Sequence, residues 1–181
     1  MGESTMMRSV TMGDLPALQA WDEDPEIVAL MGRKYEETNT ADWFQSLRTE
    51  RNCRAWMIET KEGRLIGELE LAQLNWRVGS AELRICIGEK DCRSKGYGTD
   101  VIRSAMRVAF QGLQLHEVYL RVFTSNVRAV RVYERVGFRK KALMPGSDRR
   151  HDPSAVLLMS ISREQWASRQ LRTAAERLVV G

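Results

Sequence analysis

The chain has 181 residues, of which 43% are hydrophobic and 29% are charged, a composition typical of a folded globular protein rather than a disordered one. Its net charge of +4 fits an anionic ligand, but the basic residues are spread along the sequence, so we expect no nucleic-acid partner. Three cysteines without a close pair and two distant histidines argue against a metal site and a disulfide framework. No apolar run has the length of a signal peptide or a membrane span, so we expect a cytoplasmic protein with no membrane partner.

The first third of the chain favours one short strand and several helices. Residues 6–14 favour the strand, and residues 14–32 favour a helix that Pro25 divides into two pieces. We expect Asp14 to cap the first piece. Another short helix is expected over 39–52.

From residue 54 the hydrophobic period changes to two, which predicts strands. Residues 54–60, 64–74 and 80–88 are rich in β-forming residues, and turn-like sequences separate them. The sequence therefore predicts an antiparallel meander of three strands.

The second half of the chain alternates helices and strands. An apolar helix stripe begins near Val101 and ends at Gly112, and residues 116–124 predict a strand buried on both faces. A second helix over 126–136 is followed by two strands and a final amphipathic helix. We therefore expect one α/β domain over 1–162 with a mixed sheet, and a helical tail over 163–181.

A turn with two glycines, CRSKGYGTDVI at 92–102, lies between a hydrophobic strand and an expected helix. Glycine lets the backbone adopt conformations that a Cβ obstructs, and it lets a ligand approach the main chain closely. The first turn of a helix offers unpaired N–H groups and a dipole that favour an anion. We therefore expect a phosphate-binding turn at the carboxyl end of its strand, where open α/β sheets bind ligands.

Two common phosphate-binding motifs fit this turn poorly. A P-loop places its lysine after the last glycine, whereas Lys95 precedes both glycines here. A dinucleotide-binding fingerprint needs a third small residue, and Val101 stands at the corresponding position. The preceding strands also form a meander rather than a β-α-β unit.

The pattern R-x-x-G-x-G at 93–98 resembles the pyrophosphate loop of the GNAT superfamily of acetyl-CoA-dependent N-acetyltransferases. The sequence NVRAVRVYERVGF at 126–138 resembles that superfamily's second signature, an Asn that opens a helix carrying a Tyr and ending at Gly-Phe. Residues 64–102 are similar to the ribosomal-protein N-acetyltransferase-like branch and, within it, to spermidine N-acetyltransferases. The resemblance implies a GNAT-like fold, with a mixed but mostly antiparallel sheet of about seven strands and helices on both faces.

The resemblance also implies acetyl-CoA as co-substrate and no metal. Backbone N–H groups over 94–99 would bind the pyrophosphate, with positive charge added by Arg93 and Lys95. Main-chain groups of Ile85 and Ile87 would pair with the pantetheine arm, although both residues also fit core positions. The residues expected to bind acetyl-CoA are Ile85, Cys86, Ile87, Arg93, Ser94, Lys95, Gly96, Tyr97, Gly98, Thr99 and Asn126.

Tyr133 is the candidate general acid for the departing thiolate. Its spacing from Val130 and Val136 alone fits a core aromatic residue, but its place in the second signature favours the acid. Asn126 either caps the helix or also reaches the co-substrate, and the sequence leaves both open.

The candidate bases are glutamates on neighbouring strands. Glu68 and Glu70 share one strand face, and Glu82 lies on the next strand. Glu70 matches a carboxylate of the spermidine-acetylating branch and is the expected base, acting through water, and Glu82 lies near enough to influence its pKa. A solvated acidic face with no catalytic role is the alternative.

The expected acceptor is a primary amine of a polyamine, of another small cationic compound or of a peptide N-terminus. Glu36 and Glu37 either attract this cation or are surface charges, and Trp76 either walls the acceptor site or anchors a loop. A non-catalytic acyl-CoA-binding sensor or interaction module is the alternative function. The terminal helix packs either on its own domain or on a second subunit, so a homo-oligomer is left open.

Overall fold

We describe the fold from a computed structural model, whose described residues are 4–31, 40–49, 51–145 and 155–180. Their strands form one seven-stranded sheet in the order β1-β2-β3-β4-β5-β7-β6. Neighbouring strands are antiparallel except β4 and β5, which are parallel. This arrangement confirms the mixed, mostly antiparallel sheet predicted from the sequence. The strands are β1 (Thr5–Ser9), β2 (Arg54–Thr60), β3 (Leu65–Asn75), β4 (Ser80–Ile87), β5 (Glu117–Phe123), β6 (Arg139–Met144) and β7 (Val156–Ser162).

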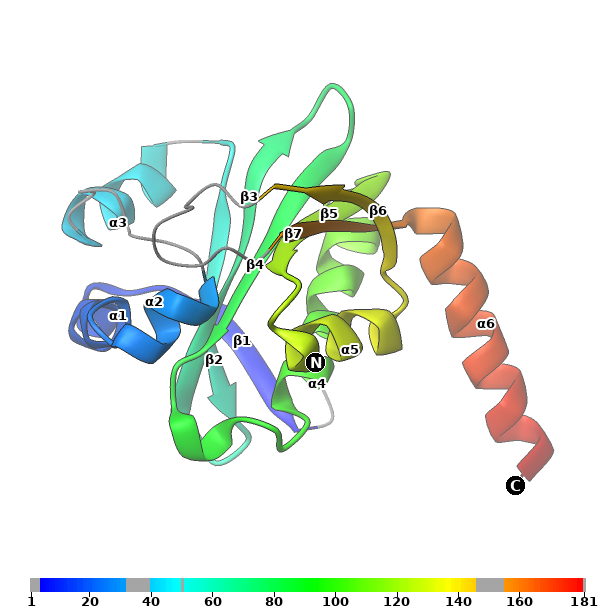
Figure 1. Cartoon of the computed structure of the whole chain (residues 1–181), viewed down its shortest axis with the longest axis horizontal. Helices are drawn as coiled ribbons and strands as arrows, with labels where there is room; N and C mark the ends of the chain where they lie inside the picture. Colours follow the sequence, from blue (N-terminus) through cyan, green and yellow to red (C-terminus); the bar gives the residue numbers. More distant parts are fainter. Residues whose placement is uncertain (1–3, 32–39, 50, 146–154, 181) are drawn as a thin grey trace.

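Helices cover both faces of the sheet, as predicted: α1, α2 and α3 lie on one side, and α4 and α5 lie on the other (Figure 1). The α-helices are α1 (Leu15–Asp22), α2 (Pro25–Met31), α3 (Thr40–Thr49), α4 (Tyr97–Arg107), α5 (Val127–Val136) and α6 (Arg163–Val180). Shorter helical segments are η1 (Met12–Asp14), η2 (Lys90–Cys92) and η3 (Val108–Gly112).

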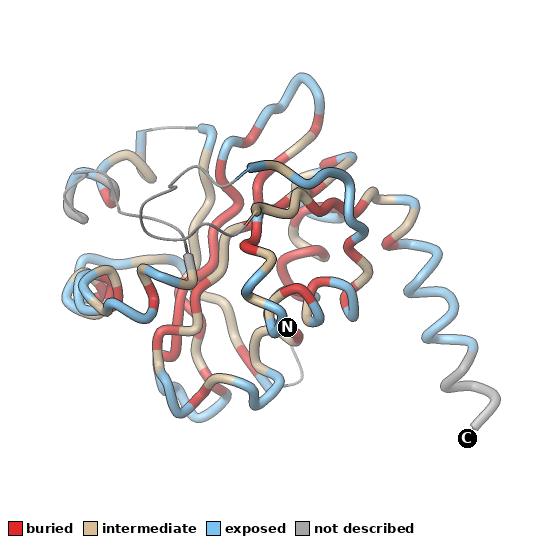
Figure 2. The backbone as a smooth tube through the Cα atoms, in the orientation of Figure 1, coloured by how far each residue is buried: buried red, intermediate tan, exposed pale blue. Residues whose placement is uncertain are grey.

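Two hydrophobic clusters hold these layers together. The larger one joins the sheet to α4 and α5 through residues such as Leu69, Leu83 and Met106. The smaller one packs α1 and α2 on the other face, where Trp21 and Ile27 meet buried strand residues. Figure 2 shows the buried residues concentrated along the central strands and the inner helix faces. Burial of this apolar surface is the main favourable contribution to folding.

The period of two in the β3–β4 hairpin sends its leucines and its glutamates to opposite faces. Glu70 lies opposite Arg84, and Ala72 lies opposite Glu82, so these side chains share a face. Leu69 and Leu71 point to the other face, into the larger cluster. The glutamates are buried rather than solvated, since Glu70 and Glu82 are each 3% exposed.

Strand β5 departs from the sequence prediction. Residues 116–124 were predicted to be buried on both faces, yet Arg121 is exposed while Val118 and Leu120 are fully buried. The prediction was wrong because the apolar residues alternate along this strand and only one of its faces meets the larger cluster.

Asp14 also differs from its predicted role. It precedes α1, but its side chain makes no capping hydrogen bond to that helix. Its carboxylate instead accepts hydrogen bonds from the backbone N–H and the hydroxyl of Thr11, and it pairs with both terminal nitrogens of Arg8 at 2.7 Å. Asp14 therefore ties strand β1 to the helical segment that follows it.

The last helix, α6, begins in the core and then leaves it. Trp166 is buried against Phe110, with ring centroids 6.4 Å apart. From Ala167 to Ala175 the described side chains are exposed, and the helix extends away from the rest of the chain (Figures 1 and 2). None of the helices described is long and apolar enough to cross a membrane.

Candidate active site

The site forms where two parallel strands part. β4 and β5 pair only at three positions, from Ser80 opposite Glu117 to Glu82 opposite Tyr119. Beyond Glu82, β4 continues along β3 to Ile87, while β5 continues along β7. A cavity of about 570 Å³ lies at this opening, between the end of β4, the glycine turn and α5, with α2 on its other side. Its size suits a small-molecule ligand.

The glycine turn has the backbone shape of an anion site. Ser94 and Gly96 both have left-handed backbones, with φ values of 64° and 90°. Helix α4 starts directly afterwards, so its first N–H groups have no partner within the helix. A Cβ placed at Gly96 or Gly98 would meet no atom within 4 Å, and both glycines line the cavity. The turn therefore offers N–H donors and free space together.

Most of the residues expected to bind acetyl-CoA line this cavity, while Lys95 and Tyr97 belong to the turn without lining it. The lining members of that group are Ile85, Cys86, Ile87, Arg93, Ser94, Gly96, Gly98, Thr99 and Asn126. The structure thus brings together two segments that are about thirty residues apart in the sequence.

Arg93 is bound to the protein itself. Its Nε donates to the carbonyl of Ile87 at 3.0 Å, and one terminal nitrogen donates to the carbonyl of Gly88 at 3.0 Å. Its other terminal nitrogen lies 2.8 Å from a carboxylate oxygen of Glu26. Arg93 therefore fastens the end of β4 to α2, and much of its charge is neutralised within the chain.

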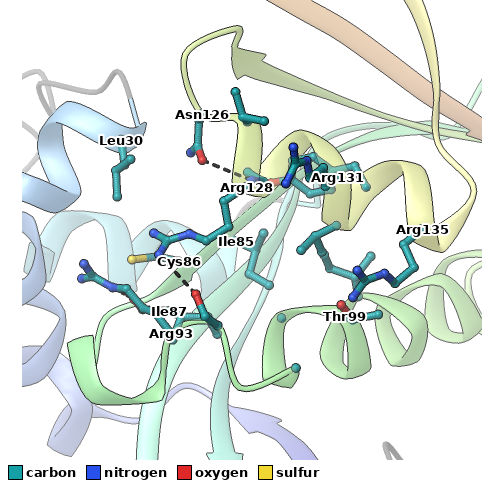
Figure 3. A pocket seen from close by; sticks show the side chains of 18 of the residues that line it. Leu30, Ile85, Cys86, Ile87, Arg93, Thr99, Asn126, Arg128, Arg131 and Arg135 are labelled. Atoms are coloured by element: carbon teal, nitrogen blue, oxygen red, sulfur yellow. Dashed lines mark hydrogen bonds between the residues drawn. The ribbon is translucent and has the colours of Figure 1, made fainter.

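Three arginines of α5 line the cavity and were missed by the sequence analysis (Figure 3). Arg128, Arg131 and Arg135 lie three and then four residues apart, so they share one side of the helix. Arg128 reaches across to the glycine turn, where it donates to the hydroxyl of Ser94 at 3.4 Å. The spacing was readable in the sequence, but which side of α5 faces the turn was not.

Tyr133 lies on α5 with only 9% of its surface exposed, and it lines the cavity. Burial, together with the nearby Cys86 thiol, raises the pKa of Tyr133 to about 12. Its ring packs edge-on against Phe138, with centroids 5.9 Å apart. The phenol therefore stays protonated at neutral pH and can donate a proton to a group in the cavity.

Asn126 has the capping role that was one of its two expected roles. Its side-chain oxygen accepts a hydrogen bond from the N–H of Ala129 at 3.2 Å (Figure 3). Asn126 also lines the cavity. The two roles are compatible, because its amide NH₂ group still has hydrogen-bond donors to offer.

The two candidate bases share one arginine. A terminal nitrogen of Arg84 lies 3.7 Å from a carboxylate oxygen of Glu70, and another lies 2.8 Å from Glu82. Arg121 also donates to both carboxylate oxygens of Glu82, at 2.7 and 3.1 Å. Burial opposes the ionisation of Glu82, but hydrogen bonds and charge from the two arginines outweigh it and lower the pKa of Glu82.

The remaining predicted residues lie away from the cavity or outside the described chain. Trp76 is 49% exposed at the tip of the β3–β4 hairpin, where its indole N–H donates to the carbonyl of Arg51 at 2.9 Å. This contact is the loop anchor that was one of its two expected roles. Glu36 and Glu37 lie outside the described residues.

Two further residues of α2, Ile27 and Leu30, complete the wall opposite α5. The cavity thus combines backbone N–H donors, arginines, apolar side chains and a buried phenol. Such a lining fits a long molecule with an anionic diphosphate, a neutral arm and a reactive thioester, which are the parts of acetyl-CoA.

Comparison with known proteins identifies the family. Residues 5–139 match the family model described as an acetyltransferase (GNAT) domain. The chain is 29% identical over 140 residues to spermidine N(1)-acetyltransferase of Vibrio cholerae, covering 76% of this chain and 80% of that protein. It is 32% identical over 85 residues to the enzyme of the same name from Escherichia coli K12, covering 47% of this chain and 45% of that protein.

Solved structures share the fold. The Vibrio cholerae spermidine N-acetyltransferase in complex with CoA and spermine superposes with a TM-score of 0.81 at 24% identity, over 90% of this chain and 98% of that one. A dodecameric structure of the same enzyme gives a TM-score of 0.79, over 91% of this chain and 97% of that one. Because the family model covers most of the sequence, the chain belongs to the GNAT acetyltransferases and is an acetyl-CoA-dependent N-acetyltransferase that acts on an amine.

Proposed function

We propose that the acceptor is a linear polyamine such as spermidine, and that the glycine turn holds the pyrophosphate of acetyl-CoA. The observation that carries the proposal is the buried acidic face beside the cavity. Glu68 lies opposite Cys86, which lines the cavity, and Glu70 follows on the same face. Buried carboxylates at this place would attract a cationic amine far more strongly than a neutral one. Similarity to a spermidine N(1)-acetyltransferase supports the same acceptor.

The residues present supply the parts that the reaction needs. A polyamine arrives protonated, with a pKa near that of lysine, about 10.4, so one proton must leave before the nitrogen attacks. Glu70 accepts this proton through water, since it is the carboxylate held less closely by Arg84. The new C–N bond forms as the C–S bond breaks, and Tyr133 donates its proton to the departing thiolate. The second proton that the acetylated nitrogen loses then restores the phenol of Tyr133. Backbone N–H groups over 94–99 hold the diphosphate throughout.

Release of free thiol from acetyl-CoA tests this proposal with a matched set of acceptors. The set contains spermidine, spermine, a monoamine of similar chain length, an aminoglycoside and short peptides with free N-termini. We expect spermidine and spermine to be turned over with the highest kcat/KM, and we expect that value to fall as salt screens the acidic face. Turnover of peptides or of the monoamine at an equal or higher kcat/KM would contradict the polyamine assignment.

A further inference from the structure

The cavity carries more positive charge than a diphosphate needs. Four arginines line it, and the described lining residues include no Asp or Glu. Arg93 is balanced by Glu26 and by two backbone carbonyls. The three arginines of α5, here called the α5 arginine row, can therefore bind an anion in addition to the one bound by the N–H groups of the glycine turn.

The α5 arginine row also extends farther than the single helical turn that would bind one phosphate group. From Arg128 to Arg135 the helix rises by roughly 10 Å, about twice the length of the single helical turn at the start of α4. Arg128 already contacts the glycine turn through Ser94. Arg131 and Arg135 are exposed, and within the described chain neither side chain makes a hydrogen bond or an ion pair.

Coenzyme A carries a second anionic group that this charge would suit. Its ribose bears a 3′-phosphate monoester, which holds about two negative charges at neutral pH, as other phosphate monoesters do. Arginine is the side chain best suited to bind such a group, because its planar donors pair with two phosphate oxygens at once.

We propose that Arg131 and Arg135 form a subsite for the 3′-phosphate of coenzyme A and make the enzyme select this form over 3′-dephospho-coenzyme A. The inference rests on the proposed placement of the diphosphate at the glycine turn. Arg128, which is bonded to Ser94, then serves the diphosphate, and the two remaining arginines serve the second phosphate. The subsite sets affinity and selectivity and takes no part in acetyl transfer.

Calorimetric titration with coenzyme A and with 3′-dephospho-coenzyme A tests the subsite. The proteins are the wild type, Arg131→Gln, Arg135→Gln and the double variant, with Arg103→Gln as a control. Arg103 is an exposed arginine of α4 that does not line the cavity, so its exchange removes the same charge elsewhere. Because Arg131 and Arg135 are exposed, the variants should keep the wild-type melting temperature, which circular dichroism checks.

We expect the wild type and Arg103→Gln to bind coenzyme A about ten- to hundredfold more tightly than the dephospho form. The double variant should lose most of this preference, with its affinity for the dephospho form nearly unchanged. Equal affinity of the wild type for both ligands would overturn the subsite while leaving the enzyme's function intact. An equal loss for both ligands in the double variant would overturn it too, because the arginines would then serve the diphosphate. Binding of neither ligand by the wild type would overturn the placement of the co-substrate itself.

Discussion

Arg84 stands between the two buried glutamates, and its distances to them differ. It lies 2.8 Å from Glu82 and 3.7 Å from Glu70, and Arg121 holds Glu82 from a second side. Glu82 is thus ion-paired with two arginines, whereas Glu70 lies farther from Arg84 than Glu82 does. We infer that Glu82, rather than Glu70, is the main partner of Arg84.

Exchange of each glutamate for glutamine separates these roles. Glu82→Gln should lower the free energy of unfolding by about 2 kcal/mol, less than the loss of a fully buried ion pair because Arg121 is half exposed. Glu70→Gln should lower kcat/KM for spermidine by about a hundredfold with a smaller change in stability. Urea unfolding and thiol release measure the two effects, and Glu23→Gln, at an exposed residue directly after α1, is the control.

The reverse pattern would assign the base differently. If Glu70→Gln kept full activity while a correctly folded Glu82→Gln lost it, Glu82 would be the base and Glu70 a structural residue.

At the scale of elements, the link between β1 and the first helical segment depends on one carboxylate. The pKa of Asp14 is lowered from 3.8 to about 2, mainly by hydrogen bonds from Arg8. Burial raises this pKa, but hydrogen bonds from Thr11 lower it further. A carboxylate whose pKa is lowered by folding stabilises the folded state above its unfolded pKa and loses this effect as pH falls through its folded pKa. The stabilisation is therefore complete above about pH 4 and disappears toward pH 2.

Asp14→Asn should consequently lower the free energy of unfolding by about 2 kcal/mol at neutral pH. The difference from the wild type should shrink as the pH falls from about 4 to about 2, because the wild-type carboxyl then becomes neutral as well. Urea unfolding at several pH values measures this difference. A difference that stays constant over the whole range would show that the charge of Asp14 does not stabilise the fold.

The glycine turn makes a separate prediction at the same scale. A Cβ at Gly98 meets no atom of the protein, and Gly98 lies in the first turn of α4 without a left-handed backbone. Gly98→Ala should therefore leave stability unchanged or raise it by up to about 1 kcal/mol. It should still weaken binding of coenzyme A, because the added methyl group would occupy the space in which we propose that the diphosphate binds. Calorimetry and thermal melting measure both quantities, and unchanged affinity would place the diphosphate elsewhere.

At the scale of the whole molecule, the sequence was sufficient for the elements and for half of the residues that line the cavity. Three predicted features depend only on neighbouring residues, and the structure contains all of them. They are the period of two in the β3–β4 hairpin, the helix break at Pro25 and the helix end at Gly137. The two signatures at 93–98 and 126–138 pointed to segments that the sheet brings together.

What the sequence could not reveal depends on the relative placement of elements. The ion pair of Arg93 with Glu26 needs α2 to lie against the end of β4, and the α5 arginine row needs one side of α5 to face the glycine turn. Strand β5 is buried on the face that meets the larger cluster, to which α4 and α5 also contribute. These are tertiary arrangements, and no period or spacing along a single element contains them.

We propose that one cavity combines two functions, with Tyr133 taking part in acetyl transfer and the glycine turn binding the co-substrate. The most direct test is single-turnover acetylation of spermidine by the wild type and by Tyr133→Phe, with the affinity for coenzyme A measured by calorimetry. We predict that the rate of acetyl transfer falls by about a hundredfold or more while the affinity is kept. A variant that transfers the acetyl group at the wild-type rate would contradict the account, because the buried phenol would then have no part in the reaction.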